Sequence, residues 1–175
     1  MTPLEDVLKG RDERAALQSR LLKGGGSRFL IQVSLNIPGF PKTIEAGDEI
    51  VAYAAVCLKE EISGFIGEET LLNGAGLCTL LVFSGTNDDA AKAKNATLRL
   101  EEETGWGRLM DLDVLTENGA LKRETIGKRQ RKCLLCGNDA KICAAEGSHA
   151  VSALRAEVSR LAAEFIASQK CTEPK

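Results

Sequence analysis

The 175-residue sequence has few aromatic residues, a single histidine and almost no net charge. Aromatic side chains make up 4% of the chain, and the formal net charge is −2 at pH 7. Proteins that bind nucleic acid usually combine a strongly basic face with aromatic residues that stack on bases. The composition therefore argues against a nucleic-acid partner, although it allows local basic clusters.

Long apolar runs are missing as well. No stretch approaches the roughly 20 consecutive apolar residues that a membrane-spanning helix needs. Residues 1–6 are acidic and lack the basic-then-apolar order of a signal peptide. The glycines at 24–26 lack the Gly-Lys-Ser/Thr ending of a P-loop, so we interpret them as a turn. Together these absences predict a cytoplasmic protein without a membrane partner.

The apolar pattern predicts a single domain of the α+β class, with mixed α/β layers. Its length, 43% hydrophobic content and 27% charged content are ordinary for one soluble domain. Helices and strands interleave without strict β-α-β alternation, which favours a mixed sheet. We expect a catalytic core over residues 1–127, then a Cys/His knuckle and a helix over 128–175. The expected elements are one or two short helices over 3–22 broken near Gly10, strands over 29–37 and 77–83, a helix after 43, a helix over 87–103, and a helix opening at Ser148 or His149.

Residues 107–114, Gly-Arg-Leu-Met-Asp-Leu-Asp-Val, place Asp111 and Asp113 two positions apart inside an apolar run. On a strand, residues i and i+2 share a face, so the two carboxylates would point the same way. Like charges held that close repel unless a cation lies between them, and Mg²⁺ is the usual oxygen-bound cation in phosphoryl chemistry. The alternative is a hairpin strand with two solvated aspartates.

Cysteine and histidine side chains cluster near the C-terminal end, as Cys133, Cys136, Cys143 and His149. A C-x2-C turn with a further cysteine and a histidine can close a tetrahedral zinc site, and four protein ligands indicate a structural rather than a catalytic metal. Buried or spectator thiols are the alternative. Cys57 and Cys78 lie in apolar runs and are interpreted as core residues, and Cys171 as incidental.

Basic residues surround both motifs. Arginine binds phosphate through two N–H groups at once, whereas lysine offers a point charge. Arg108, three residues before Asp111, could hold a polyphosphate together with a metal. Taken alone, most of the other basic residues are interpreted as solvated surface charges: Arg11, Arg14, Arg20, Lys122, Arg123, Lys128, Arg129, Arg131 and Lys132.

These motifs, in this order, resemble the holo-citrate lyase synthase family, the apo-citrate lyase phosphoribosyl-dephospho-CoA transferases. The similarity runs through the whole chain. It is carried by residues 107–114, residues 131–136 (Arg-Lys-Cys-Leu-Leu-Cys), Cys143, His149, residues 11–14 (Arg-Asp-Glu-Arg) and Pro38-Gly39.

The resemblance implies a transferase that attaches the prosthetic group of citrate lyase. The donor would be 2′-(5″-triphosphoribosyl)-3′-dephospho-CoA, and the acceptor a serine of the small acyl carrier (gamma) subunit of apo-citrate lyase. A phosphodiester would form and pyrophosphate would leave. This is nucleotidyltransferase-type chemistry, and it implies a nucleotidyltransferase-like fold.

Under that resemblance Asp111 and Asp113 would hold one or two Mg²⁺ ions, and Arg108 would hold the α- or β-phosphate. Further substrate-binding candidates are Arg11, Arg14, Arg131 and Lys132. Glu101 could be a third carboxylate, or an exposed acid in the run Glu101–Glu103.

Two other functions stay open from the sequence. One is a non-catalytic zinc-knuckle adaptor that binds protein or nucleic acid. The other is an analogous transferase acting on another carrier, such as that of malonate decarboxylase.

Overall fold

Five strands form one sheet in the order β2-β3-β1-β4-β5, and every neighbouring pair is antiparallel. The structure, a computed structural model, describes residues 2–170, so Cys171 lies outside it. The strands are β1 (Arg28–Leu35), β2 (Phe65–Asn73), β3 (Gly76–Ser84), β4 (Met110–Thr116) and β5 (Gly119–Ala120). The α+β class is confirmed, but the sheet is not mixed as expected. Two of its four pairings are tight hairpins, and a hairpin joins antiparallel strands by necessity.

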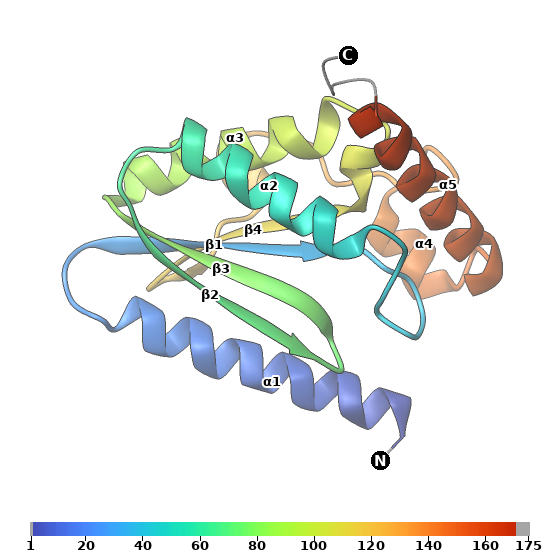
Figure 1. Cartoon of the computed structure of the whole chain (residues 1–175), viewed down its shortest axis with the longest axis horizontal. Helices are drawn as coiled ribbons and strands as arrows, with labels where there is room; N and C mark the ends of the chain where they lie inside the picture. The colour runs from blue at the N-terminus through green and yellow to red at the C-terminus, as the bar shows by residue number, and fades with distance from the viewer. Residues whose placement is uncertain (1, 171–175) are drawn as a thin grey trace.

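The helices form separate layers (Figure 1). One long helix lies alone against one face of the sheet, two cover the other face, and two lie beyond one end. None of the helices in residues 2–170 is long and apolar enough to cross a membrane. Their bounds are α1 (Pro3–Leu22), α2 (Gly47–Glu61), α3 (Asn87–Glu102), α4 (Ala140–Glu146) and α5 (Val151–Lys170), with short 3₁₀ helices η1 (Trp106–Leu109) and η2 (Arg123–Ile126).

Helix α1 is continuous, so the expected break near Gly10 is wrong. The helix begins with a capping box between Thr2 and Glu5 and has proline at its first position. Gly10 allows Asn73 to approach the helix closely, because a Cβ at position 10 would lie 2.5 Å from the side-chain oxygen of Asn73. Asn73 also donates a hydrogen bond to the Gly10 carbonyl at 3.0 Å. The β2–β3 turn therefore rests directly on α1.

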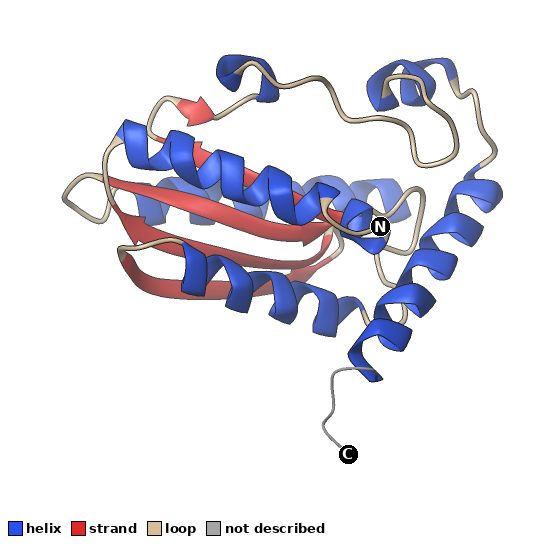
Figure 2. Cartoon of the chain, turned by 90° about the horizontal axis from the view of Figure 1, so that it is seen from above, coloured by secondary structure: helices blue, strands red, loops and turns tan. Residues whose placement is uncertain are grey.

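The main core lies between the sheet and helices α2, α3 and α5. The rings of Tyr53, Trp106 and Phe165 meet edge to face within it. Since Phe165, Val158 and Leu161 belong to α5, the C-terminal region packs into the same core as the rest of the chain. The segment from β5 to α4 reaches that position as a long loop, interrupted by η2, along one side of the molecule (Figure 2).

The sheet face toward α1 is different in character. Gln32 and Ser34 of β1 are buried on this face beneath α1, whereas Ile31 and Val33 point to the main core on the other face. Strand β4 contributes the two aspartates to the same face. A polar layer between α1 and the sheet is therefore the natural place to look for a site.

Candidate active site

Asp111 and Asp113 share one face of β4, as their spacing predicted. Exposure alternates along the strand: Met110, Leu112 and Val114 are buried in the core, whereas the two aspartates are only partly buried. Asp111 lies opposite Ser34 and Asp113 opposite Gln32 in the pairing with β1. The carboxylates therefore lie on the polar face toward α1.

The charged form of Asp113 is disfavoured in this position. Burial raises the pKa of Asp113, and the negative charge of Asp111 raises it further. The positive charges of Lys94 and Arg131 act in the opposite direction. An oxygen-rich, partly buried pair of this kind suits a hard divalent cation, because the cation would relieve the repulsion. The residues present thus fit a Mg²⁺ site, with Asp111 and Asp113 as the protein ligands.

A cavity of about 340 Å³ lies beside Asp111, between α1 and the sheet. Arg11 and Arg14 of α1 line it, so the structure brings these two predicted phosphate ligands to the predicted metal ligands. Arg14 is held in place by its terminal nitrogen Nη2, which donates to the carbonyls of Ala75 and Gly76, both at 2.7 Å. The arrangement places fixed positive charge next to a candidate cation site, as polyphosphate binding requires.

Three polar residues of the same pocket form a chain of hydrogen bonds. Gln18 of α1 donates to the Gln32 side-chain oxygen at 2.7 Å, and Gln32 donates to Ser34 Oγ at 3.4 Å. Sequence reasoning missed these residues. A signal existed, because Gln32 and Ser34 interrupt the apolar run 29–37 at alternate positions, and alternate positions face the same side of a strand.

The outer edge of β4 pairs with β5 only at Leu115 and Thr116, and side chains close the rest of that edge. Glu101 accepts a hydrogen bond from the Leu112 N–H at 2.9 Å, and buried Lys94 donates to the Leu112 carbonyl at 3.0 Å. Arg131 donates to the Met110 carbonyl at 2.8 Å. The backbone that carries the aspartates is therefore fixed on both sides, since β1 pairs with the other edge.

Glu101 is neither an exposed acid nor a free third carboxylate. Its side chain is 5% exposed and forms ion pairs with Arg123 and Arg131. With the Leu112 N–H as a third donor, both carboxylate oxygens are occupied by groups of the protein. The spacing of α3 explains the burial, because Lys94 and Glu101 lie two turns apart on the face toward β4.

Arg131 connects this edge to the candidate metal site. Its Nη1 lies 3.5 Å from an Asp111 oxygen, and its Nη2 lies 2.5 Å from Glu101. Burial alone would lower the pKa of Arg131, but the charges of Glu101 and Asp111 outweigh it and raise the pKa. Of the two residues predicted from the 131–136 motif, Arg131 thus reaches the aspartates. Lys132 instead lines a second cavity, of about 700 Å³, together with residues 128–131.

Arg108 does not occupy the position that the sequence suggested. Its guanidinium donates to the carbonyls of Lys132, Cys133 and Leu134, so it fastens η1 to the cysteine segment. It lines the larger cavity rather than the pocket beside Asp111. Arg108 thus holds the cysteine segment in place and lies away from the pocket beside Asp111, so this arrangement does not support its predicted role as the phosphate ligand there.

The Cys/His cluster assembles as a compact knuckle. The ligand atoms of Cys133, Cys136, Cys143 and His149 all lie within 4.8 Å of one another. Cys136 Sγ lies 3.6 Å from Cys143 Sγ and 3.4 Å from His149 Nε2. Sulfurs about 3.8 Å apart are what tetrahedral Zn²⁺ with 2.3 Å bonds requires. The donor set and its spacing fit structural zinc.

The thiols of the knuckle are prepared unequally for a metal. Burial raises the pKa of Cys133, but hydrogen bonds from the backbone N–H groups of Leu135 and Cys136 outweigh it, so the net pKa is lowered. Burial and the neighbouring thiols raise the pKa of Cys143 to about 11. A bound cation would offset that cost, because zinc ligands bind as thiolates.

Lys42 is a charged residue of the pocket that the sequence did not indicate. It lies in the loop after β1, more than sixty positions from the aspartates, and reaches the small cavity beside Asp111. No local motif marks it. Lys42 reaches the site because its loop packs against α5, through Arg155, and against β3, at Gly76.

Comparison with known proteins adds an independent line of evidence. The family model described as apo-citrate lyase phosphoribosyl-dephospho-CoA transferase matches residues 2–165. A Streptococcus pyogenes serotype M18 protein, named as a probable apo-citrate lyase phosphoribosyl-dephospho-CoA transferase, is 34% identical over 93% of this chain and 86% of its own length. A Vibrio cholerae serotype O1 protein of the same name is 30% identical over 93% of this chain and 92% of its own.

A third similar protein is larger. Protein CitXG of Leuconostoc mesenteroides subsp. cremoris is 27% identical over 93% of this chain but only 35% of its own length. The present chain is thus similar to about a third of that protein. All these matches extend across both motifs, the aspartate strand and the knuckle.

Proposed function

The chain belongs to the apo-citrate lyase phosphoribosyl-dephospho-CoA transferase family, and we propose that it transfers a phosphoribosyl-dephospho-CoA prosthetic group to apo-citrate lyase. The donor is 2′-(5″-triphosphoribosyl)-3′-dephospho-CoA, and the acceptor is a serine of the acyl carrier (gamma) subunit. The observation that carries the proposal is the pair Asp111 and Asp113, set on one face beside a pocket lined by Arg11 and Arg14.

The reaction is a nucleotidyltransferase-type displacement at phosphorus. The serine oxygen forms a bond to the phosphorus nearest the ribose, and the bond from that phosphorus to the bridging oxygen breaks. Pyrophosphate leaves with the electron pair of the broken bond, and the serine proton passes to solvent. Atoms and charge balance without a further reactant.

Asp111 and Asp113 would hold Mg²⁺, which supplies charge neutralisation for the triphosphate and lowers the pKa of the acceptor hydroxyl. Arg14 and Arg11 bind and orient the phosphates from the α1 side. Arg131 lies 3.5 Å from Asp111 and would orient its carboxylate. Glu101 in turn fixes Arg131, so it is a positioning residue rather than a metal ligand.

The knuckle has a supporting role in the same proposal. Zn²⁺ held by its three cysteines and His149 would keep the 131–136 segment in shape. That segment includes Arg131 and is clamped by Arg108, so its shape determines where Arg131 meets Asp111. Arg108 and the knuckle thus support the site from a distance.

Replacement of Asp111 by asparagine tests the proposed transfer activity directly. Purified protein is incubated with the triphosphoribosyl donor, Mg²⁺ and apo-carrier, and the mass of the carrier and the released pyrophosphate are measured. We expect wild type to modify the citrate lyase carrier and Asp111→Asn to release no pyrophosphate while keeping its fold. Unchanged activity of Asp111→Asn would rule out the assigned centre.

A second acceptor distinguishes related functions. The same incubation is repeated with the carrier of malonate decarboxylase. Modification of that carrier alone would leave the chemistry in place but reassign the acceptor. The gamma subunit variant with its acceptor serine changed to alanine is the matched control and should gain no mass.

Metal analysis tests the knuckle separately. Protein purified under reducing conditions should contain about one zinc per chain, and Cys143→Ser should contain less. A zinc-to-protein ratio near zero for the wild type would refute the structural zinc site.

A further inference from the structure

A third cation reaches the pocket beside Asp111. Lys42 lines the same cavity of about 340 Å³ as Arg11 and Arg14, although it comes from the loop between β1 and α2. Its ammonium group donates to the Ile37 carbonyl at 2.6 Å, which leaves two further N–H donors. Three cations from two separate segments therefore converge on one polar space.

The charges of this pocket are unbalanced. Asp111 is the one acid among the described residues that line it, and Asp111 is already 3.5 Å from Arg131. Burial lowers the pKa of Lys42, and the positive charges of Arg11, Arg155 and Arg14 lower it further. Like charges gathered in this way oppose folding unless an anion balances them.

Arg14 brings a fixed positive charge to the same pocket. Its Nη2 donates to the carbonyls of Ala75 and Gly76, which hold the side chain in place. Its Nε is buried and has no hydrogen-bond partner among the residues that the structure describes. Both hydrogen bonds of Nη2 go to neutral acceptors, so the charge of Arg14 is available to balance an anion in the pocket.

The loop that carries Lys42 is built to hold it still. Arg155 of α5 donates to the carbonyls of Pro38 and Pro41, at 3.2 and 2.8 Å, and so ties the loop to the C-terminal helix. On the other side, the Lys42 carbonyl lies against Gly76, where a Cβ would come within 2.7 Å of it. Such fixation costs flexibility, and it is typical of groups that must be in place before a ligand binds.

We propose that Lys42, together with Arg11 and Arg14, forms the subsite for the two outer phosphates of the donor and holds the leaving pyrophosphate. The inference deepens the proposed function and rests on it for the identity of the donor. When the bond to the inner phosphorus breaks, its electron pair stays on the pyrophosphate oxygen. The added negative charge then faces Arg11 together with Arg14 and Lys42, which hydrogen bonds to backbone carbonyls already hold in place.

Pyrophosphate itself is the probe. Its binding to the purified chain in the presence of Mg²⁺ is measured by isothermal titration calorimetry, with neither donor nor carrier present. Loss of one charged hydrogen-bonding partner should weaken binding by about 10- to 100-fold. We therefore expect this loss for Lys42→Met, and we expect Lys42→Arg to recover most of the affinity.

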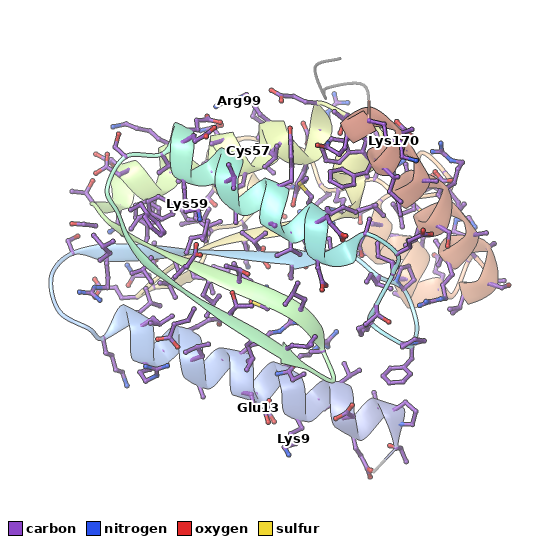
Figure 3. All side chains as sticks on the ribbon, in the orientation of Figure 1. Lys9, Glu13, Cys57, Lys59, Arg99 and Lys170 are labelled. Carbon is purple, nitrogen blue, oxygen red and sulfur yellow. The ribbon has the colours of Figure 1, made fainter. Side chains whose placement is uncertain are left out.

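Lys9→Met is the matched control. Lys9 lies on α1 between the capped end and Arg11, but its side chain is 64% exposed and pairs with Glu13 on the side away from the sheet (Figure 3). Lys9→Met removes the same charge as Lys42→Met but lies outside the pocket. Its pyrophosphate affinity should match the wild type.

The outcomes separate the inference from the function on which it rests. Wild-type affinity in Lys42→Met, with an unchanged melting temperature, would overturn the subsite, and so would absence of pyrophosphate binding by the wild type. If pyrophosphate binds through Lys42 but no carrier is modified in the transfer assay, the subsite stands and the proposed acceptor chemistry fails. Methionine keeps the length of the lysine stem, and circular dichroism checks that the fold is retained.

Discussion

Asp113→Asn should make the metal-free protein more stable while it removes activity. The carboxylate of Asp113 is partly buried and faces the charge of Asp111, and both effects raise its pKa. A raised pKa means that the ionised group opposes folding at neutral pH. The amide has nearly the same shape and no charge, so it relieves the repulsion but binds Mg²⁺ more weakly than a carboxylate does.

The size of the effect follows from the strand. Two residues along a strand are separated by about 6.6 Å, and two unit charges at that distance repel by about 2.5 kcal/mol at an effective dielectric constant near 20. The charges of Lys94 and Arg131 cancel part of this. We expect a net gain of about 1 kcal/mol, or about 2–4 °C in melting temperature for a domain of this length.

The gain should depend on pH in a defined direction. Below the unfolded-state pKa of about 3.9, Asp113 is neutral in both folded and unfolded chains, and the substitution changes nothing. As the pH rises from the unfolded-state pKa to the raised folded-state pKa, wild type loses stability relative to the variant, and the difference is fully developed above the folded-state pKa. Activity should fall by at least about 100-fold, as for other removed transition-state contacts.

Thermal melts in Mg²⁺-free buffer measure the effect, and the fluorescence of buried Trp106 reports unfolding. Addition of Mg²⁺ should stabilise the wild type but not Asp113→Asn. Asp12→Asn is the control, because Asp12 is exposed on α1 and should change stability by less than about 0.5 kcal/mol. The reasoning is refuted if Asp113→Asn is equally or less stable than the wild type at pH 7 without Mg²⁺.

Three further predictions concern the groups around the site. Glu101→Gln should lower the free energy of unfolding, measured in urea, by about 3 kcal/mol, because two partly buried arginines lose their shared counter-charge. Glu102→Gln, at a side chain that is 62% exposed, should lower it by less than about 1 kcal/mol, and equal losses would contradict the buried role of Glu101. Cys136→Ser should bind less zinc and melt at a lower temperature, and an unchanged metal content would argue against its ligand role. Gly76→Ala should lower the free energy of unfolding by about 1–2 kcal/mol and weaken pyrophosphate binding, because Gly76 has φ +92° and an added Cβ would meet the Lys42 carbonyl. Wild-type affinity for pyrophosphate in this variant would show that the position of the loop is unimportant.

Local patterns in the sequence were sufficient for several features. The parity of the strand placed Asp111 and Asp113 on one face, and residues 87–103 formed the expected helix α3. The knuckle residues lie within seventeen positions, so one loop and a short helix suffice to gather them. Each of these features depends on contacts between near neighbours, which periodicity and spacing describe directly.

Other features were wrong or missed for a common reason. Gly10 was expected to break α1, but it is there to admit the β2–β3 turn, which lies more than sixty residues away. Glu101 was weighed as exposed or metal-bound, yet it is buried by two arginines from the segment after β5. Arg108 is next to the aspartates in sequence, but its donors are used by the knuckle. Contacts between distant segments decided all three.

The sequence by itself therefore determined the chemical groups, two carboxylates on one strand face and a Cys/His knuckle, and the resemblance to the apo-citrate lyase phosphoribosyl-dephospho-CoA transferase family. Only the tertiary structure decided which cations serve them. Arg11 and Arg14 arrive because α1 packs across the polar face of the sheet, and Lys42 because α5 holds its loop against β3. Layer packing joins segments by burying surface rather than by sequence spacing, so no local pattern could have named the third cation.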